Sequence, residues 1–196
     1  MSSSRSSADV AGVSAGEWVA VFGCGGVGLA AVMIARSRGA RVIGIDINGH
    51  ALALAVQAGA EITFDASTGD AVERILDVVP QGVDVAVDAL GSAGTADSAT
   101  RSLRIHGRHL QIGLLPPAVI GDHATVPMHT VISRELSVHG SHGMAAAGYP
   151  RLLADIAAGL LDPAQFITRT ITLGDTPAAL AQMSTSTEPG ITIIRP

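Results

Sequence analysis

The clearest chemical signal in the sequence is a run of glycines near the N-terminus. Gly23, Gly25 and Gly28 form the pattern G-x-G-x-x-G. The pattern follows the apolar, strand-prone run 18–22 and precedes the helix-like segment 27–37, which is the context that a dinucleotide-binding turn requires. In such a turn the first glycine permits the tight bend, the second lets a pyrophosphate approach the backbone, and the third lets the helix lie close to the strand. Free N–H groups and the positive end of the helix dipole attract the anion.

An acidic side chain follows at a suitable distance. Asp46 ends the next strand-like run, 18 residues after Gly28. A carboxylate about 20 residues beyond the turn can accept hydrogen bonds from the adenosine ribose hydroxyls. It also repels a 2′-phosphate, so NAD is favoured over NADP. Each feature alone suits a structural turn or a polar strand end, but their combination predicts dinucleotide binding.

These residues need a particular scaffold to bring them together. Strand-like runs alternate with helix-like runs along most of the chain, and this rhythm predicts βαβ units and a parallel sheet covered on both faces. With right-handed crossovers the sheet is doubly wound, so we expect an α/β Rossmann fold. Strands are expected at 18–22, 41–45, 62–64, 83–87, 107–112 and 135–139, and helices at 27–37, 51–58, 71–79 and 95–103.

The second half of the sequence is less regular. We expect a loop from Leu114 to about Pro127, and then a helix at 150–159, a strand at 166–173, a helix at 176–183 and a strand at 190–195. Residues 1–14 are rich in Ser and Ala and are expected to be a flexible N-terminal segment. Residues 15–196 are expected to form one coenzyme-binding domain.

Composition excludes several other kinds of protein. The sequence contains no lysine, so its 12 basic residues are all arginine, and Walker phosphate loops, Schiff-base lysines and protein kinase sites cannot be built. A single cysteine excludes internal disulfides and multi-thiolate zinc sites. The net charge of −5 argues against nucleic-acid partners. No apolar run spans a bilayer and no signal peptide is recognisable, so we expect a soluble cytoplasmic protein without membrane contact.

The glycine turn and the stretches after it resemble the coenzyme domain of medium-chain zinc-dependent alcohol dehydrogenases. The first glycine distinguishes the turn from that of the zinc-free quinone reductases, which usually carry a small residue such as Ala there. The resemblance covers about residues 15–196, in family order. It is carried by 16–29, 42–48, 58–60, 83–91, 112–116 and 134–141.

The resemblance implies roles for residues at matching positions, with NAD as the cofactor. Gly23, Gly25, Gly26 and Val27, with Gly28, would surround the pyrophosphate, and Asp46 would hold the adenosine ribose. Ala89, Leu90 and Gly91 would lie near the adenine-side ribose and the coenzyme backbone. Ile112, Gly113 and Leu114 would bring main-chain groups to the nicotinamide carboxamide. The loop after Leu114 resembles the segment through which such enzymes dimerise, which implies a homodimer.

The sequence also departs from the family pattern. Alcohol dehydrogenases often place a lysine shortly after the acidic residue, where this chain has Gly49, His50 and Ala51. In the family a catalytic domain precedes the coenzyme domain and supplies the zinc ligands, and residues from about 150 to 196 would return toward that domain. We find no usual zinc ligands and assign no catalytic residue. The chain is expected to bind NADH but not to oxidise alcohols alone, whether it is a short gene product, a truncated reading frame or a fragment.

Other features leave alternatives open. Cys24 lies in the glycine turn, where a thiol can be acidified, although a small residue that simply fits is the plainer interpretation. His139 and His142 could hold a metal only with a third ligand, and a polar strand exit explains them better. We assign no chemistry to His106, His109, His123 and His129. The whole chain could also be a non-catalytic dinucleotide-binding subunit or sensor, or an S-adenosylmethionine-dependent methyltransferase.

Overall fold

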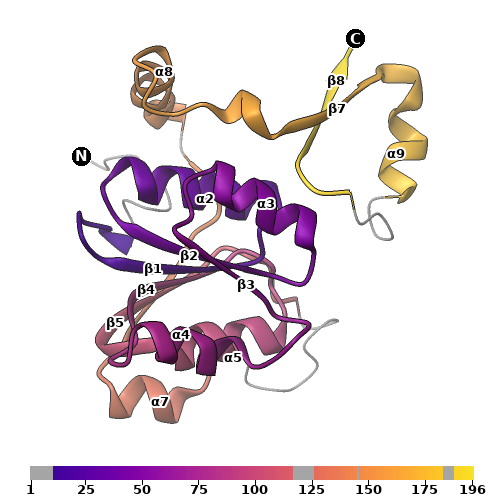
Figure 1. Ribbon diagram of the computed structural model, residues 1–196. Coiled ribbons are helices and arrows are strands. Elements are labelled where there is room, and N and C mark those ends of the chain that lie inside the picture. Colours follow the sequence, from indigo (N-terminus) through magenta and orange to yellow (C-terminus); the bar gives the residue numbers. More distant parts are fainter. Residues whose placement is uncertain (1–10, 117–125, 145, 183–187) are drawn as a thin grey trace.

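A parallel sheet of six strands forms the centre of the computed structural model, which describes residues 11–116, 126–144, 146–182 and 188–196 (Figure 1). The strand order is β3-β2-β1-β4-β5-β6, so the order reverses between β1 and β4. This is the doubly wound Rossmann arrangement, and it confirms the predicted fold. The strands are β1 Trp18–Phe22, β2 Arg41–Asp46, β3 Ile62–Asp65, β4 Val83–Asp88, β5 Leu103–Gln111 and β6 Ser137–Gly140.

Helices cover both faces of this sheet (Figure 1). Alternate side chains of β1 point to opposite faces, with Val19 and Val21 in one apolar core and Ala20 and Phe22 in the other. Burial of the strands on both faces explains their nearly continuous apolar sequences. On one face lie α2 Gly26–Ser37 and α3 Gly49–Gln57, and on the other α4 Ala71–Val78, α5 Ala93–Arg101 and α7 Met128–Ser133.

Side chains just before three helices stabilise the helix starts at the carboxyl edge of the sheet. Asn48 accepts hydrogen bonds from the first turn of α3, Asp70 does the same for α4, and Ser92 forms a reciprocal capping box with Thr95 in α5. These caps satisfy N–H groups that have no partner within the helix. They also fix where the chain turns back from the sheet, and so they shape the surface at this edge.

The main differences between the structure and the predicted elements concern α7, β5 and β6. The helix α7 was not predicted, because its six residues follow a proline and carry no long periodic pattern. The strand β5 begins at Leu103 rather than at 107, and its register against β4 shifts between Val83 and Val85. The strand β6 begins two residues later than expected, after Glu135 adopts a positive φ of 52°. The expected loop from Leu114 lies largely outside the described residues.

The C-terminal part forms a separate small unit. It contains α8 Tyr149–Ala157, β7 Ile167–Thr172, α9 Thr176–Gln182 and β8 Ile191–Arg195. The strands β7 and β8 pair in parallel in a two-stranded sheet of their own, which projects from the main body together with α9 (Figure 1). Leu161 and Phe166, which lie before β7, are buried and anchor the unit to the core beside α2.

The N-terminal segment is described only in part. Residues 1–10, most of the segment expected to be flexible, lie outside the described residues. Ala11 is buried in the core. Its neighbour Gly12 accepts a hydrogen bond of 2.9 Å from Arg108 of β5, and Arg108 also forms an ion pair with Glu17. Within the described part of the chain, none of the helices has the length and apolarity that a membrane crossing demands.

Candidate coenzyme site

The predicted site residues meet at the carboxyl edge of the sheet, where the strand order reverses. Main-chain hydrogen bonds bind the strand ends together there: the N–H of Gly23 donates to Ile45 at 2.8 Å, and that of Ala89 donates to Phe22 at 2.9 Å. In open α/β sheets this crevice is where ligands bind. The expected residues all lie at the carboxyl ends of β1, β2, β4 and β5 or directly after them: Gly23, Gly25, Gly26, Val27, Gly28, Asp46, Ala89, Leu90, Gly91, Ile112, Gly113 and Leu114.

The first and last glycines of the turn are required by geometry. Gly23 has a φ of 88°, a backbone conformation that residues with a β-carbon rarely adopt. A β-carbon on Gly28 would lie 1.8 Å from the carbonyl oxygen of Gly23. Any larger residue at Gly28 would therefore push α2 away from β1. Both glycines perform the structural roles that the sequence predicted for them.

The start of α2 offers main-chain donors to a ligand. Gly25 occupies the N-cap position, no side chain caps the helix, and its first turn carries no acidic residue. A β-carbon on Gly25 would meet nothing within 4 Å, so the space beside it is open. An uncapped helix start with open space beside it can receive a phosphate group. Gly26 faces β8 instead, since a β-carbon there would lie 3.5 Å from Ile191.

Asp46 is held firmly in place beside the turn. One carboxylate oxygen accepts a hydrogen bond of 2.6 Å from the N–H of Cys24, and the other accepts one of 2.9 Å from the N–H of Asn48. The carboxylate therefore links the glycine turn to the start of α3. The side chain remains half-exposed, so it can also accept hydrogen bonds from a sugar. His50, in the place of the family's lysine, lies exposed in the first turn of α3.

Cys24 is a packing residue. Its thiol is buried and lies 3.7 Å from the carbonyl oxygen of Ile45. Burial, and secondarily the negative charge of Asp46, raises the pKa of Cys24 to about 12. The thiol is thus kept protonated, so the acidified nucleophile considered from the sequence is wrong and the plainer interpretation holds.

A pocket of about 600 Å³ lies beside Asp46. Its walls combine apolar side chains with the polar caps of α4 and α5, a mixture suited to a flat base and its sugar. Sequence reasoning missed most of these residues, although the Ser-x-x-Thr spacing of a capping box could have drawn attention to two of them. The lining residues are Phe22, Gly23, Ile45, Asp46, Ile47, Asn48, Ala66, Gly69, Asp70, Ala71, Leu90, Ser92, Gly94, Thr95 and Ser98.

The loops after β4 and β5 form the other half of the crevice. Asp88, the last residue of β4, is fully buried and accepts hydrogen bonds from the N–H groups of Leu90 and Gly91 at 3.0 and 2.9 Å. The carbonyl oxygen of Asp88 accepts from Ile112 and Gly113 at 2.9 and 2.8 Å. Asp88 was not among the residues predicted from the sequence, although an acidic residue at the end of an apolar strand is a recognisable signal.

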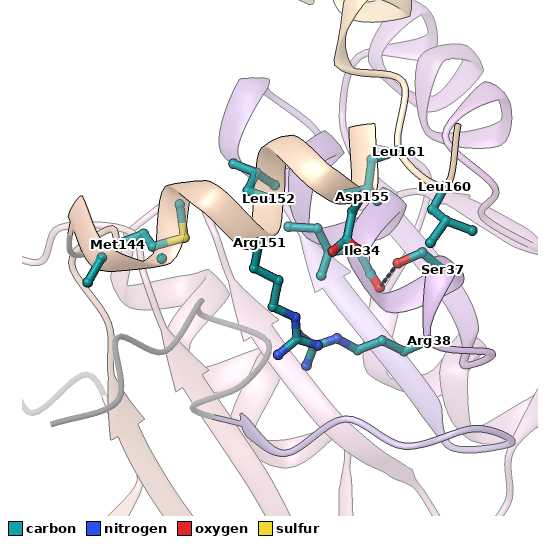
Figure 2. A pocket seen from close by; sticks show the side chains of 11 residues that line it. Ile34, Ser37, Arg38, Met144, Arg151, Leu152, Asp155, Leu160 and Leu161 are labelled. Atoms are coloured by element: carbon teal, nitrogen blue, oxygen red, sulfur yellow. Dashed lines mark hydrogen bonds between the residues drawn. The ribbon is translucent and has the colours of Figure 1, made fainter. Parts of the chain in front are cut away.

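A different pocket, of about 300 Å³, lies between α2 and α8 at the opposite end of α2 from the glycine turn. In the view of Figure 2 the side chains of Arg38 and Arg151 overlap below the apolar side chains of Ile34 and Leu152. Its described lining residues include none of the predicted site residues. It marks where α8 rests on α2 rather than a second part of the coenzyme site.

Among the described residues, the histidines and carboxylates are not grouped as a metal site requires. Across the described ranges, no three His, Cys, Asp or Glu side chains lie close enough together to hold an ion. His139 in β6 is half-buried and His142 is exposed. His106 faces Glu135 at 3.5 Å, and His109 is buried beneath the crevice. The residues of the described chain therefore do not fit the zinc that the resemblance implies.

Known proteins support the arrangement described above. D-xylulose reductase A from Aspergillus niger is 28% identical over 179 residues, which cover 88% of this chain and 49% of that protein. An alcohol dehydrogenase from Geobacillus stearothermophilus is 32% identical over 132 residues, covering 67% of this chain and 37% of that enzyme. The chain spans about half the length of the curated relatives that match most of it.

Solved structures agree with the fold. A protein from Sinorhizobium meliloti 1021, described as a zinc-binding dehydrogenase bound to NADP, superposes with a TM-score of 0.87 at 31% identity, over 97% of this chain and 55% of that one. The alcohol dehydrogenase TADH from Thermus sp. ATN1 has the same fold, with a TM-score of 0.84 at 23% identity, over 97% of this chain and 54% of that one. These likenesses disfavour the methyltransferase alternative. Residues 26–158 match the family described as "Zinc-binding dehydrogenase", and this chain belongs to that family.

Proposed function

We propose that this chain binds NAD(H) and serves as the coenzyme domain of a zinc-type alcohol dehydrogenase-like oxidoreductase. The observation that carries the proposal is the open, uncapped start of α2 at Gly25, placed between β1 and the fixed carboxylate of Asp46. The pyrophosphate binds at the helix start, the adenosine occupies the pocket beside Asp46, and the second nucleotide lies over β4 and β5. The bound coenzyme supplies or accepts the hydride.

The negative charge of the adenosine pocket supports a preference for NAD over NADP. Two carboxylates, Asp46 and Asp70, belong to the adenosine pocket, and its described lining residues include no arginine or histidine. A 2′-phosphate on the adenosine ribose would face the negative charge of Asp46, while the charge of Asp70 is partly offset by Arg101 at 3.7 Å. The Sinorhizobium meliloti protein carries NADP. The preference is therefore a property of this chain's own residues and has to be measured on this chain.

Hydride transfer to or from an alcohol needs a second component. Zinc chemistry requires ligands that the described residues do not bring together. The strands β7 and β8 support the existence of such a component, because parallel strands are normally covered on both faces and a two-stranded sheet is marginal by itself. Apolar side chains at Ile167, Leu173, Leu180 and Ile194 are exposed around this unit. We place a catalytic domain against it.

Two further parts of the proposal concern assembly and location. The segment expected to form a homodimer lies mostly at 117–125, outside the described residues, so the homodimer stays a prediction. The single cysteine suits a reducing compartment, and we place the protein in the cytoplasm.

The alternative is a non-catalytic dinucleotide-binding subunit or sensor. It is favoured by the absence of a three-ligand metal group among the described residues. Both functions require NADH binding, and they differ in catalysis. An alcohol-dependent rise in NADH absorbance with added zinc would show that the chain acts by itself. Recovery of that rise only after a separate catalytic chain is added would support the coenzyme-domain function.

Calorimetric titration of the full chain tests binding. NADH is expected to bind, and NADPH to bind at least about ten-fold more weakly, which corresponds to about 1.4 kcal/mol. In Asp46→Asn we expect weaker NADH binding and a smaller difference between the two coenzymes, because the repulsion of the 2′-phosphate is removed. Asp77→Asn, on the exposed face of α4, is the matched control and should leave both affinities unchanged. The absence of heat at millimolar NADH would refute the proposal.

A further inference from the structure

A chain of buried and half-buried polar side chains lies directly beneath the crevice, outside the residues that the resemblance assigned. Asp88 and Gln111 occupy the last positions of β4 and β5 and are partners in the strand register. The amide nitrogen of Gln111 donates a hydrogen bond of 2.8 Å to the Asp88 carboxylate. The other carboxylate oxygen of Asp88 accepts from the N–H groups of Leu90 and Gly91. One buried carboxylate thus holds the loop after β4 and the side chain at the end of β5 together.

The orientation of the Gln111 amide is fixed by its neighbours. Its nitrogen also donates to the carbonyl oxygen of Gly113 at 2.8 Å, so both of its partners are acceptors. The amide oxygen must therefore face the other way, where it lies 2.9 Å from Nε2 of His109. Since that oxygen can only accept, Nε2 of His109 carries a proton. Burial lowers the pKa of His109, which favours the neutral ring over the charged one.

The two loops that Gln111 joins are also in close main-chain contact. A β-carbon on Gly91 would lie 2.3 Å from the carbonyl oxygen of Leu114, and one on Gly113 would lie 2.2 Å from the nitrogen of Gly91. The two loops are packed main chain against main chain, so neither can move toward the other without displacing it. The hydrogen bonds of Gln111 therefore set the position of a shared unit rather than of one loop.

Gln111 also sets the direction of a main-chain donor at the crevice. The carbonyl group of Gly113 and the N–H of Leu114 belong to one planar trans peptide, so they point in opposite directions. Because the Gln111 amide binds the carbonyl oxygen of Gly113, the N–H of Leu114 points away from Gln111. Leu114 itself is 71% exposed. The hydrogen bond from Gln111 thereby fixes the orientation of this peptide before a ligand arrives.

The ligand on this side is the second half of the dinucleotide. The adenosine half is assigned to the pocket beside Asp46, at the ends of β1, β2 and β3. A dinucleotide that crosses the glycine turn continues over β4 and β5, the other half of the doubly wound sheet. The shared unit of 88–91 and 111–114 lies at the ends of those strands.

We infer that Gln111 is a positioning residue for the nicotinamide half of the coenzyme: its amide, oriented by Asp88 and His109, fixes the main chain of Gly113 and Leu114 against which that half binds. The inference rests on the proposed binding of NAD(H). It assigns no contact between Gln111 and the coenzyme. Loss of the amide costs affinity by letting the main chain move, not by removing a direct contact.

The test compares two ligands on the full chain. Gln111→Met keeps the size of the side chain but removes its donor and acceptor. NADH affinity is expected to fall about ten-fold, the effect of one to two lost hydrogen bonds. The affinity for ADP-ribose, which lacks the nicotinamide ring, should stay within about two-fold, and the shift in nicotinamide fluorescence on NADH binding should shrink. Gln57→Met, at the exposed end of α3, is the control and should change neither ligand.

Equal affinities in Gln111→Met and the unchanged chain would overturn the inference, and so would a parallel loss of both ligands, which would indicate general damage to the fold. If Gln111→Met does not fold, His109→Leu takes its place, because it keeps the buried volume and leaves the Gln111 amide oxygen without its donor. It is judged by the same selective loss of NADH affinity. Failure of the unchanged chain to bind NADH would instead overturn the proposed function and this inference with it.

Discussion

The α-carbon of Gly28 faces the carbonyl oxygen of Gly23 so closely that a β-carbon on Gly28 would lie 1.8 Å from that oxygen. Gly28→Ala should therefore force α2 away from β1. We expect a loss of at least about 2 kcal/mol in the free energy of unfolding, since overpacking against main chain cannot be relieved by a side-chain rotation. Urea unfolding measures it. Gly49→Ala, where a β-carbon meets nothing within 4 Å, is the control and should cost nothing.

Gly25→Ala should leave stability almost unchanged and weaken NADH binding instead. A β-carbon at Gly25 has no neighbour within 4 Å, and the φ of −74° is ordinary for alanine. The free energy of unfolding should change by less than about 0.5 kcal/mol. NADH affinity should nevertheless fall at least about ten-fold, because the methyl group occupies the approach of the pyrophosphate. An alanine here that leaves NADH titrations unchanged would show that the pyrophosphate does not bind at this turn.

The thiol of Cys24 should resist alkylation in the folded protein. Burial raises its pKa to about 12, and the reagent reacts with the thiolate. At pH 8 we expect iodoacetamide to react at least about 100-fold more slowly in buffer than in 8 M urea, as followed by intact mass. The assignment is unambiguous because the chain has one cysteine. Similar rates in both conditions would mean that the turn opens readily.

His109 should make stability depend on pH in a defined window. Burial lowers its pKa below the ordinary 6.5, an effect partly opposed by Gln111 and by the charge of Asp88. The unfolded chain therefore binds this proton more readily, so stability is full above about pH 6.5 and declines as the pH falls toward the folded pKa. Urea midpoints at pH 7.5 and 5.5 measure the decline, which His109→Leu should reduce.

The pH range in which His109 affects stability differs from that of the carboxylates. The pKa of Asp65 is lowered by hydrogen bonds from Ser67, and that of Asp175 by hydrogen bonds from Thr172. The contributions of these two carboxylates to the free energy of unfolding are lost only as the pH falls below about 4. In that range the same carboxylates bind protons in the unfolded chain. An identical decline between pH 7.5 and 5.5 in His109→Leu and the unchanged chain would remove His109 as its source.

Local sequence patterns predicted the parts of the site that depend on neighbours along the chain. The glycine turn is defined by spacing between a strand and a helix, and Asp46 by its place after β2, so both were recognisable. The contact between Asp88 and Gln111 depends on the register of β4 against β5, which shifts within the pair and leaves no trace in either strand alone. The pairing of β7 with β8 in a sheet of their own is likewise a tertiary property, because each strand could have extended the large sheet.

Gly26 belongs to the coenzyme turn, yet its nearest neighbour is Ile191 of β8, 3.5 Å from where a β-carbon would stand. A dinucleotide bound at the turn and a protein surface bound to β8 would therefore contact neighbouring residues. Binding free energies are linked reciprocally, so if occupation of β8 changes coenzyme affinity by some factor, the coenzyme changes affinity at β8 by the same factor. Ile191 lies beside the coenzyme turn and is therefore the contact through which such a coupling would pass.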